Sequence, residues 1–513
     1  MVKPLPFFSA RKVYANAWPI WVALIALLYY PTYRTYPIFD DTAYVQWVIA
    51  YGASFLHHPE SPVFRPFERL MIGLSWKMPG NGYWLAKTFS LTLLLIKTWL
   101  VAILGGMLFR DRRPLLRFAV PVLYLVHPMH VASVIKIDTI SENLWSFWAL
   151  VLTVLVAGLC FVPDEKLSNA RVLRFALAAS LISLLGMLSK EASLGIAAST
   201  PLLLSVAAIR QRQKSKAGFA LLVSAGFTAV AMACYFYLRL LAGYSLTGGD
   251  PAARYKFHLG FNFLLNAAAS IGASLFPGST LNIFVHFNLF YVALAAGLVL
   301  TAIVLWLPQY IGFLRRTRSG IARVSPEARL LQVMAIAAFA SLGPGGLISG
   351  LISENQSAGT IPFVLMLIVF IPAWMFDTDD PRRQSSRPAA TMVLLAMMLV
   401  LMSTATSQKV EAAHEMSRRA YAMGDEMVKD YIAHPVGHYF LCIPPDSFTR
   451  GKYSIFSFSD GMLAAFQLYR IELLHPPKPA NFIPDLPAYR TACSMRVVDE
   501  KLYEETPTAA EAR

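Results

Sequence analysis

The stretch "WLAKTFSLTLLLIKTWLVAILGGMLFRDRRPLLR", residues 84–117, joins a long apolar run to a short basic segment. The run covers residues 84–108, which is long enough as a helix to cross a hydrocarbon core of about 30 Å. The segment that follows, residues 110–117, carries four arginines and one aspartate. Basic residues collect in short cytoplasmic loops of membrane proteins. The stretch therefore predicts a transmembrane helix that ends at the cytoplasmic face.

The composition of the whole chain agrees with this local pattern. The chain has 513 residues, of which 56% are hydrophobic and 15% charged, and its mean hydropathy is +0.51. A soluble domain is roughly 45–50% apolar and about a quarter charged. Helices satisfy their own backbone polar groups and can therefore cross a bilayer. The sequence predicts an all-α polytopic membrane protein.

The apolar runs predict about eleven transmembrane helices of this length. With the N-terminus in the cytoplasm, alternation places the basic segments 110–117, 210–216, 315–323 and 380–387 on the cytoplasmic side. This bias accounts for the net charge of +15, so the expected partner is the lipid bilayer and no nucleic acid is predicted. The predicted spans are 17–34, 84–108, 117–137, 141–162, 172–189, 192–209, 217–240, 289–312, 329–351, 359–376 and 388–406.

The predicted topology divides the chain into two parts. Residues 1–406 form the transmembrane module, with a long external first loop at 35–83 and an external re-entrant segment at 261–282. A full crossing at 261–282 would move the basic segment 315–323 outside, against the charge bias. Residues 407–513 form a small extracytoplasmic domain. If that side is oxidising, Cys442 and Cys493 are expected to form a disulfide.

Charged and histidine side chains recur at the external ends of the predicted spans. Ionisable groups are costly in lipid and usually pair or line a wet cavity. Each residue alone also fits a structural role, such as a helix cap or a hydrogen-bonded core histidine, so the functional case depends on their convergence. We expect an externally open cavity formed by Asp40, Asp41, Arg65, His127, His130, Asp138, Glu142, Lys190, Glu191 and Glu354.

These residue types suit group transfer from a lipid phosphate. Adjacent carboxylates such as Asp40 and Asp41 can remove a proton from a hydroxyl nucleophile. Cations such as Lys190 and Arg65 can hold a phosphate leaving group. Because protein cations already serve that purpose, a divalent metal is compatible with the carboxylates but is not predicted, and no cofactor is required.

Six segments, in the same order, resemble the transmembrane O-mannosyltransferases that carry tetratricopeptide repeats, within the wider GT-C superfamily. Three departures are clear: the chain has no tetratricopeptide repeats, Ser133 stands where the family has a glutamate, and Asn355 follows Glu354 where the family has an arginine. The segments that carry the resemblance are "FDDTAYV" (39–45), "SPVFRPFERL" (61–70), "YLVHPMHVASVIKIDTISENLW" (124–145), "LLGMLSKEASLGI" (184–196), "FNFLLNAAASIGASLFPGSTLN" (261–282) and "SENQSAGTIPFVLML" (353–367).

The resemblance implies a GT-C glycosyltransferase whose donor is a dolichyl- or undecaprenyl-phosphate sugar. It does not carry over the acceptor, which is expected to be a protein, glycan or lipid. It implies that Asp41 or Asp40 is the general base and that Lys190 and Arg65 contact the phosphate, with Glu191 orienting Lys190. By the same resemblance, the acceptor or sugar pocket is lined by His127, His130, Asp138 and Glu142.

Two other functions stay open at the level of sequence. An O-antigen ligase or polymerase would transfer a whole glycan, and would rely on arginine and histidine without the acidic pair of the first loop. A transporter would more often show inverted repeats and broken helices near the bilayer midplane. The repeat-free chain and its loop composition favour a bacterial inner-membrane protein, with a cytoplasmic N-terminus and a periplasmic C-terminal domain.

Overall fold

The structure is a computed structural model of the chain. It describes residues 17–34, 64–77, 82–109, 114–137, 139–209, 214–244, 266, 274, 326–346, 361–365, 387–433, 449–450 and 453–454.

The described elements are helices, apart from two short antiparallel strands, β1 (Thr449–Arg450) and β2 (Tyr453–Ser454). The all-α fold class is therefore confirmed. The α-helices are α2 (Trp18–Tyr29), α4 (Pro66–Lys77), α5 (Gly82–Phe109), α6 (Pro114–Leu125), α7 (His130–Ile135), α8 (Ile140–Cys160), α9 (Asn169–Ser189), α10 (Leu194–Ala208), α11 (Lys214–Leu241), α15 (Pro326–Gly346) and α18 (Arg387–Ala433). Three 3₁₀ turns accompany them: η1 (Tyr30–Arg34), η3 (Asp164–Lys166) and η4 (Glu191–Ser193).

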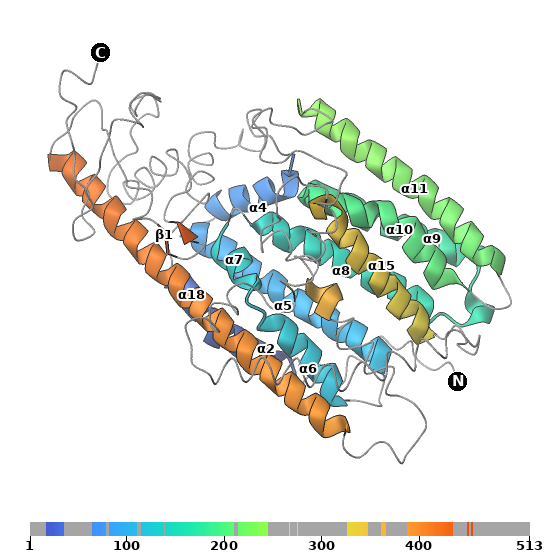
Figure 1. The fold of residues 1–513 in the computed structure, drawn as a ribbon. Helices are drawn as coiled ribbons and strands as arrows, with labels where there is room; N and C mark the ends of the chain where they lie inside the picture. The colour runs from blue at the N-terminus through green and yellow to red at the C-terminus, as the bar shows by residue number, and fades with distance from the viewer. Residues whose placement is uncertain are drawn as a thin grey trace.

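The long helices form a bundle with α8 near its centre (Figure 1). Helix α8 packs against α5, α9, α10 and α15, while α11 covers α9 and α10. Most buried aliphatic and aromatic side chains of the described helices form one large core, with two smaller clusters beside it. Helix α11 presents leucines such as Leu222 and Leu241 outward, as expected where a helix faces lipid tails instead of water.

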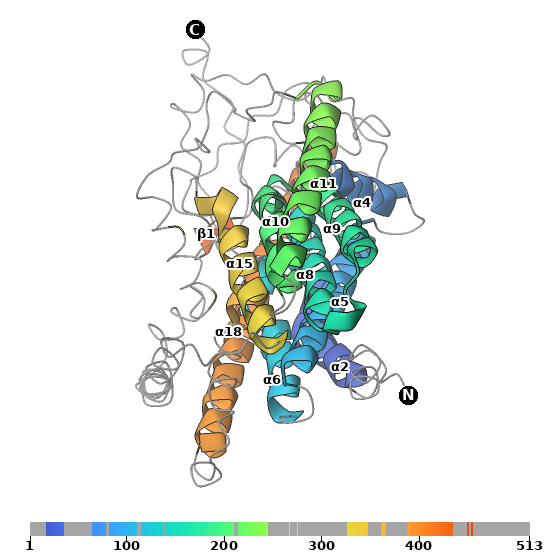
Figure 2. The same ribbon diagram turned by 90° about the vertical axis from the view of Figure 1, so that its right-hand side faces the viewer.

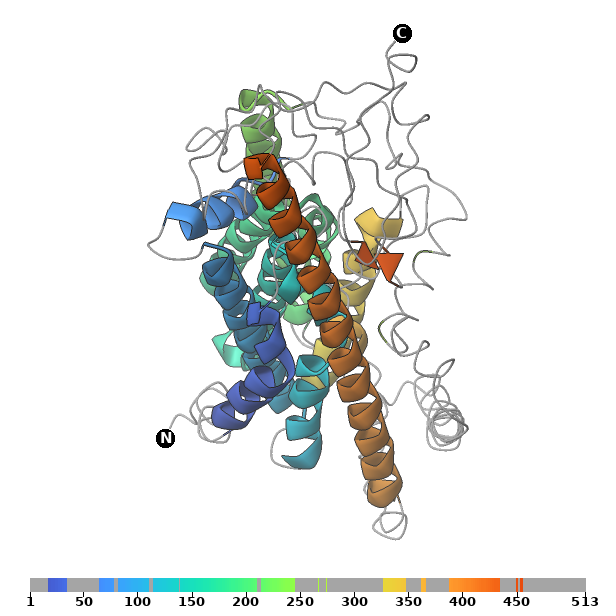
Figure 3. The ribbon, with the colours of Figure 1, turned by 90° about the vertical axis from the view of Figure 1, so that its left-hand side faces the viewer.

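Consecutive long helices run in alternating directions, so the turns fall at two ends of the bundle. Helix α4 lies across one end instead of along the bundle (Figure 2 and Figure 3), and we call this the α4 end. At the opposite end, Arg329 donates from Nη2 to the carbonyl of Cys160 at 2.5 Å and from Nη1 to that of Ile209 at 2.9 Å. These carbonyls close α8 and α10, where a cation is electrostatically favourable.

Several predicted spans correspond closely to observed helices. The predicted ranges 84–108, 141–162, 172–189 and 217–240 match α5, α8, α9 and α11 to within a few residues. Within the described part of the chain, six helical segments are long and apolar enough to cross a membrane: 84–108, 140–160, 169–189, 191–208, 215–241 and 393–415. The total of about eleven spans stays a prediction.

The predicted span 117–137 is wrong as a single helix. Helix α6 ends at Leu125 and α7 begins at His130, with a turn between them. Pro128 explains the break, because a proline disfavours helical backbone at the preceding residue and has no N–H to donate. Amides that follow bond to the carbonyl three residues back instead of four, as in the hydrogen bond from His130 N–H to the His127 carbonyl at 3.1 Å.

Helix α18 continues through the predicted domain boundary at residue 406. Its 47 residues correspond to about 70 Å, far more than a hydrocarbon core requires. The division into residues 1–406 and 407–513 stays a prediction, because most of the chain after Ala433 lies outside the described residues. Residues 35–63 of the first loop, the span 289–312 and nearly all of 261–282 also lie outside them.

Candidate functional site

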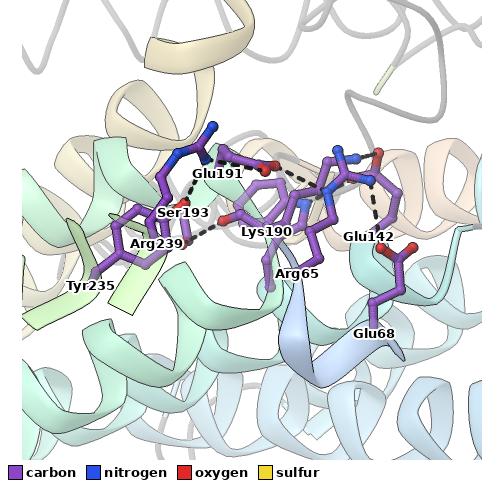
Figure 4. Close-up of polar contacts among 9 residues, drawn as sticks. Arg65, Glu68, Glu142, Lys190, Glu191, Ser193, Tyr235 and Arg239 are labelled. Carbon is purple, nitrogen blue, oxygen red and sulfur yellow. Dashed lines mark hydrogen bonds and ion pairs between the residues drawn. The ribbon is translucent and has the colours of Figure 1, made fainter. Parts of the chain in front are cut away.

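Five charged side chains from five separate segments meet at the α4 end (Figure 4). Arg65 directly precedes α4, Glu142 lies in the first turn of α8, and Lys190 caps the C-terminus of α9. Glu191 begins η4, and Arg239 lies in the last turn of α11. The predicted proximity of Arg65, Glu142, Lys190 and Glu191 is therefore present in the structure, while their role in binding stays a prediction.

The turn between α9 and η4 separates two neighbouring charges. Lys190 has extended backbone, with φ −163° and ψ 143°, so it ends the helix and successive side chains diverge. Ser193 donates from its hydroxyl to the Lys190 carbonyl at 2.8 Å. A Cβ at Gly186 would lie 3.3 Å from the Cβ of Ser193. This glycine thus allows η4 to fold closely back on α9.

The Glu191 carboxylate lies between two arginines. Arg65 donates from Nε to Glu191 Oε2 at 3.0 Å, and Arg239 Nη1 lies 3.9 Å from Oε1. The Arg65 guanidinium also lies 3.6 Å from a carboxylate oxygen of the nearly buried Glu68. Arginine binds carboxylates and phosphates with the same planar array of donors, so the site has the geometry of an oxyanion site.

Lys190 pairs with a different carboxylate, that of Glu142. The other oxygen of Glu142 accepts a hydrogen bond from the indole N–H of Trp145 at 2.8 Å. The expectation that Glu191 orients Lys190 is therefore wrong, because the extended backbone at Lys190 points the two side chains toward different partners. Glu142, on α8, holds the lysine instead.

Tyr244 helps to hold the arginines of this site. Arg69 on α4 donates to its hydroxyl at 2.6 Å, and the guanidinium of Arg239 lies 6.0 Å from the ring centroid. The ring also packs against Phe64, with centroids 5.5 Å apart. These contacts join α4 to the end of α11 through cation–π and aromatic packing.

Among the described side chains of the site, cations outnumber carboxylates. Four cations and three carboxylates, taken from the described residues, leave an excess of one positive charge. The side chains are partly open, since Arg65 is 16% and Glu191 25% exposed. A cationic, partly accessible cluster at a helix-bundle end can take up an anionic head group. The cations are Arg65, Arg69, Lys190 and Arg239, and the carboxylates are Glu68, Glu142 and Glu191.

His127 and His130 are close together but do not lie on one helix. His127 lies in the turn after α6, and its ring centroid is 6.1 Å from that of His130 at the start of α7. The Met129 amide donates to His127 Nδ1 at 3.3 Å, which leaves Nε2 to donate to the Ser274 carbonyl at 2.9 Å. Neither histidine takes part in the ion pairs described above.

Ser274 belongs to the predicted re-entrant segment, and its contact with His127 places this residue against the α6–α7 turn. The other predicted site residues lie outside the described part of the chain, and their roles stay predictions. They are Asp40, Asp41, Asp138, Glu354, Cys442 and Cys493.

Lys97 is a buried cation that the sequence reasoning did not single out. Only 2% of it is exposed, and its ammonium donates to Asn143 Oδ1 at 2.6 Å and to the Ser146 hydroxyl at 3.2 Å. A lysine inside the apolar run 84–108 was the available signal, because an ionisable group in a span is costly. The sequence reasoning also missed Arg239. The same signal was available there, because this ionisable residue lies within the predicted span 217–240.

The described residues include no group of three or more histidine, cysteine or acidic side chains arranged to hold a metal ion. The carboxylates of Glu142 and Glu191 are already engaged by cations. The described part of the site is therefore better suited to an anion than to a metal cation.

The fold places the chain in the class of polytopic all-α proteins. A solved structure with this fold is the crystal structure of ArnT from Cupriavidus metallidurans bound to undecaprenyl phosphate. The TM-score is 0.54 and the sequence identity 11%, over 94% of this chain and 96% of that one. No protein-family model and no curated protein sequence matches the chain.

Proposed function

We propose that this protein is an integral membrane glycosyltransferase that transfers a sugar from a polyprenyl-phosphate donor to a protein, glycan or lipid acceptor. The observation that carries the proposal is the convergence of Arg65, Lys190 and Arg239 at one end of the bundle, where the described side chains carry an excess of one positive charge. The likeness in fold to ArnT, whose crystal structure contains undecaprenyl phosphate, supports a lipid-linked phosphate as the ligand.

In the proposed reaction, the donor tail lies in the bilayer and its phosphate lies among these cations. An acceptor hydroxyl attacks the anomeric carbon of the sugar, and the bond from that carbon to the phosphate oxygen breaks. The proton passes to Asp41 or Asp40, which acts as the general base. The polyprenyl phosphate leaves with the bridging oxygen, and its charge is stabilised by Arg65 and Lys190.

The proposed site faces the extracytoplasmic side, in a bacterial inner membrane. Phe109 and Ile209, which directly precede the basic segments 110–117 and 210–216, lie at the end opposite to α4. The positive-inside bias supports a cytoplasmic location for that end. The N-terminus is then cytoplasmic, and the chain after α18 lies on the same side as the site.

The acidic pair provides the test of this function. Asp40→Asn and Asp41→Asn are made separately, and transfer is measured in proteoliposomes supplied with a panel of radiolabelled polyprenyl-phosphate sugars and a membrane extract as acceptor. One variant is expected to lose transfer by a factor of about 100 or more, while its binding of undecaprenyl phosphate stays close to that of the wild type.

Wild-type transfer by both variants would contradict the role of the acidic pair. Wild-type protein that transfers no sugar from any donor of the panel, and does not bind undecaprenyl phosphate in preference to undecaprenol, would contradict the proposed function itself.

A further inference from the structure

Glu191 is held at the candidate site by arginine side chains, one on each side of its carboxylate. Oε2 accepts the hydrogen bond from Arg65, and Oε1 faces Arg239 at 3.9 Å. Oε1 has no hydrogen-bond partner among the residues that the structure describes. Two guanidinium groups that flank one carboxylate form the same arrangement that would flank a phosphate.

Glu142 provides an internal comparison. Its carboxylate is fixed at both oxygens, by Lys190 and by the indole of Trp145, and only 4% of its side chain is exposed. Glu191 has a hydrogen-bond partner at only one oxygen among the described residues, lies on a three-residue turn between α9 and α10, and has a side chain that is 25% exposed. Separating a carboxylate from its cations costs more free energy when the pair is more deeply buried. Of these two carboxylates, Glu191 therefore leaves its partners at the lower cost.

We propose that Glu191 occupies the phosphate position between Arg65 and Arg239 when no lipid is bound. A polyprenyl-phosphate head group binds by displacing this carboxylate, and the return of the carboxylate expels the product. The inference rests on the proposed function and adds to it a competing anion supplied by the protein itself.

The charges on donor and product explain why such a competitor is useful. The donor is a phosphodiester with one negative charge, so its exchange for a carboxylate leaves the charge of the site unchanged. The product is a phosphomonoester with roughly 1.5–2 negative charges at neutral pH, which binds two arginines more strongly. Competition from Glu191 weakens that binding and favours release of the product.

The test compares Glu191→Gln with wild type and with Glu165→Gln, a control in the exposed turn η3 at the opposite end. Binding of undecaprenyl phosphate and of undecaprenol is measured with the full chain in lipid nanodiscs. The amide keeps the shape of Glu191 but not its charge. We expect about tenfold tighter binding of undecaprenyl phosphate by E191Q, with wild-type affinity for E165Q and no change for undecaprenol.

Two further arms make the result decisive. Inorganic phosphate is expected to compete only weakly, and competition as strong as that of the lipid would overturn the assignment to a lipid head group. Glu191→Asp shortens the side chain by one methylene, which moves the carboxylate away from the arginines but keeps its charge. It is therefore expected to tighten binding of undecaprenyl phosphate by a smaller factor than E191Q. It serves as the second variant if E191Q does not fold.

The failures of the two proposals are distinguishable. Wild-type protein that binds undecaprenyl phosphate no better than undecaprenol removes the proposed function. Wild-type protein that binds the phosphate selectively, together with Glu191 variants whose affinity is unchanged or weaker, overturns the inference about Glu191 alone and makes Glu191 a scaffold for the arginines.

Discussion

Lys190 and Glu191 are neighbours in the chain, yet each pairs with residues of other segments. Lys190 joins α9 to α8 through Glu142, and Glu191 joins η4 to Arg65 and Arg239. The two adjacent residues therefore join their own turn to three other segments at one end of the bundle, those that carry Glu142, Arg65 and Arg239. Their ion pairs hold these segments together, and both side chains are themselves part of the candidate site.

Lys190→Ala is expected to weaken binding of undecaprenyl phosphate about tenfold, because one charge-assisted contact is lost. It should also lower the free energy of unfolding by about 3 kcal/mol, since the nearly buried Glu142 loses its cation. Affinity is measured by titration in nanodiscs, and stability by thermal unfolding in the same membrane mimic.

The double variant Lys190→Met with Glu142→Gln separates the two effects. It removes both charges of the pair, so stability should largely return while affinity stays low. If Lys190→Ala binds the lipid with wild-type affinity, Lys190 has no contact with the phosphate.

At the scale of elements, the break between α6 and α7 leaves backbone carbonyls without helical partners. Neighbouring helices supply donors: Tyr29 on α2 donates to the Leu125 carbonyl at 3.3 Å, and Thr406 on α18 donates to that of Val126 at 2.6 Å. Buried carbonyls in a membrane protein need such partners. The turn that carries His127 is thus held by side chains distant in sequence.

Thr406→Val is expected to destabilise the protein by about 1–3 kcal/mol, because the Val126 carbonyl loses a buried donor. The matched control is Thr153→Val in α8, whose hydroxyl bonds to Ala149 within the same helix. That carbonyl lies in the regular part of the helix, so the control should cost much less. Thermal unfolding that shows equal losses for both would contradict this role for Thr406.

The apolar runs predicted the long helices well but not how they end or break. Run length and hydropathy define α5, α8, α9 and α11, since crossing a bilayer imposes both. Hydropathy does not register a lost amide donor, so the break before His130 was missed although Pro128 marked it. The proximity of Arg65, Glu142 and Lys190 followed from topology, whereas the pairing of Lys190 with Glu142 depends on the backbone at Lys190.

At the scale of the whole molecule, the alternating direction of the long helices places the ion-pair cluster and the residues next to the basic segments at opposite ends of the bundle. The α4 end gathers Arg65, Glu142, Lys190, Glu191 and Arg239, and the opposite end carries the residues next to the basic segments. The likeness to ArnT covers 94% of the chain, so it concerns the whole bundle. The central claim is that a lipid phosphate binds at the α4 end.

The most direct test is an experimental structure of the full chain in nanodiscs with undecaprenyl phosphate. The account predicts that the phosphate lies at the α4 end, within ion-pairing distance of Lys190 and of Arg65 or Arg239, with the tail running outward into the bilayer. A phosphate bound at the opposite end, near Arg329, or contacting none of those three cations, would contradict it.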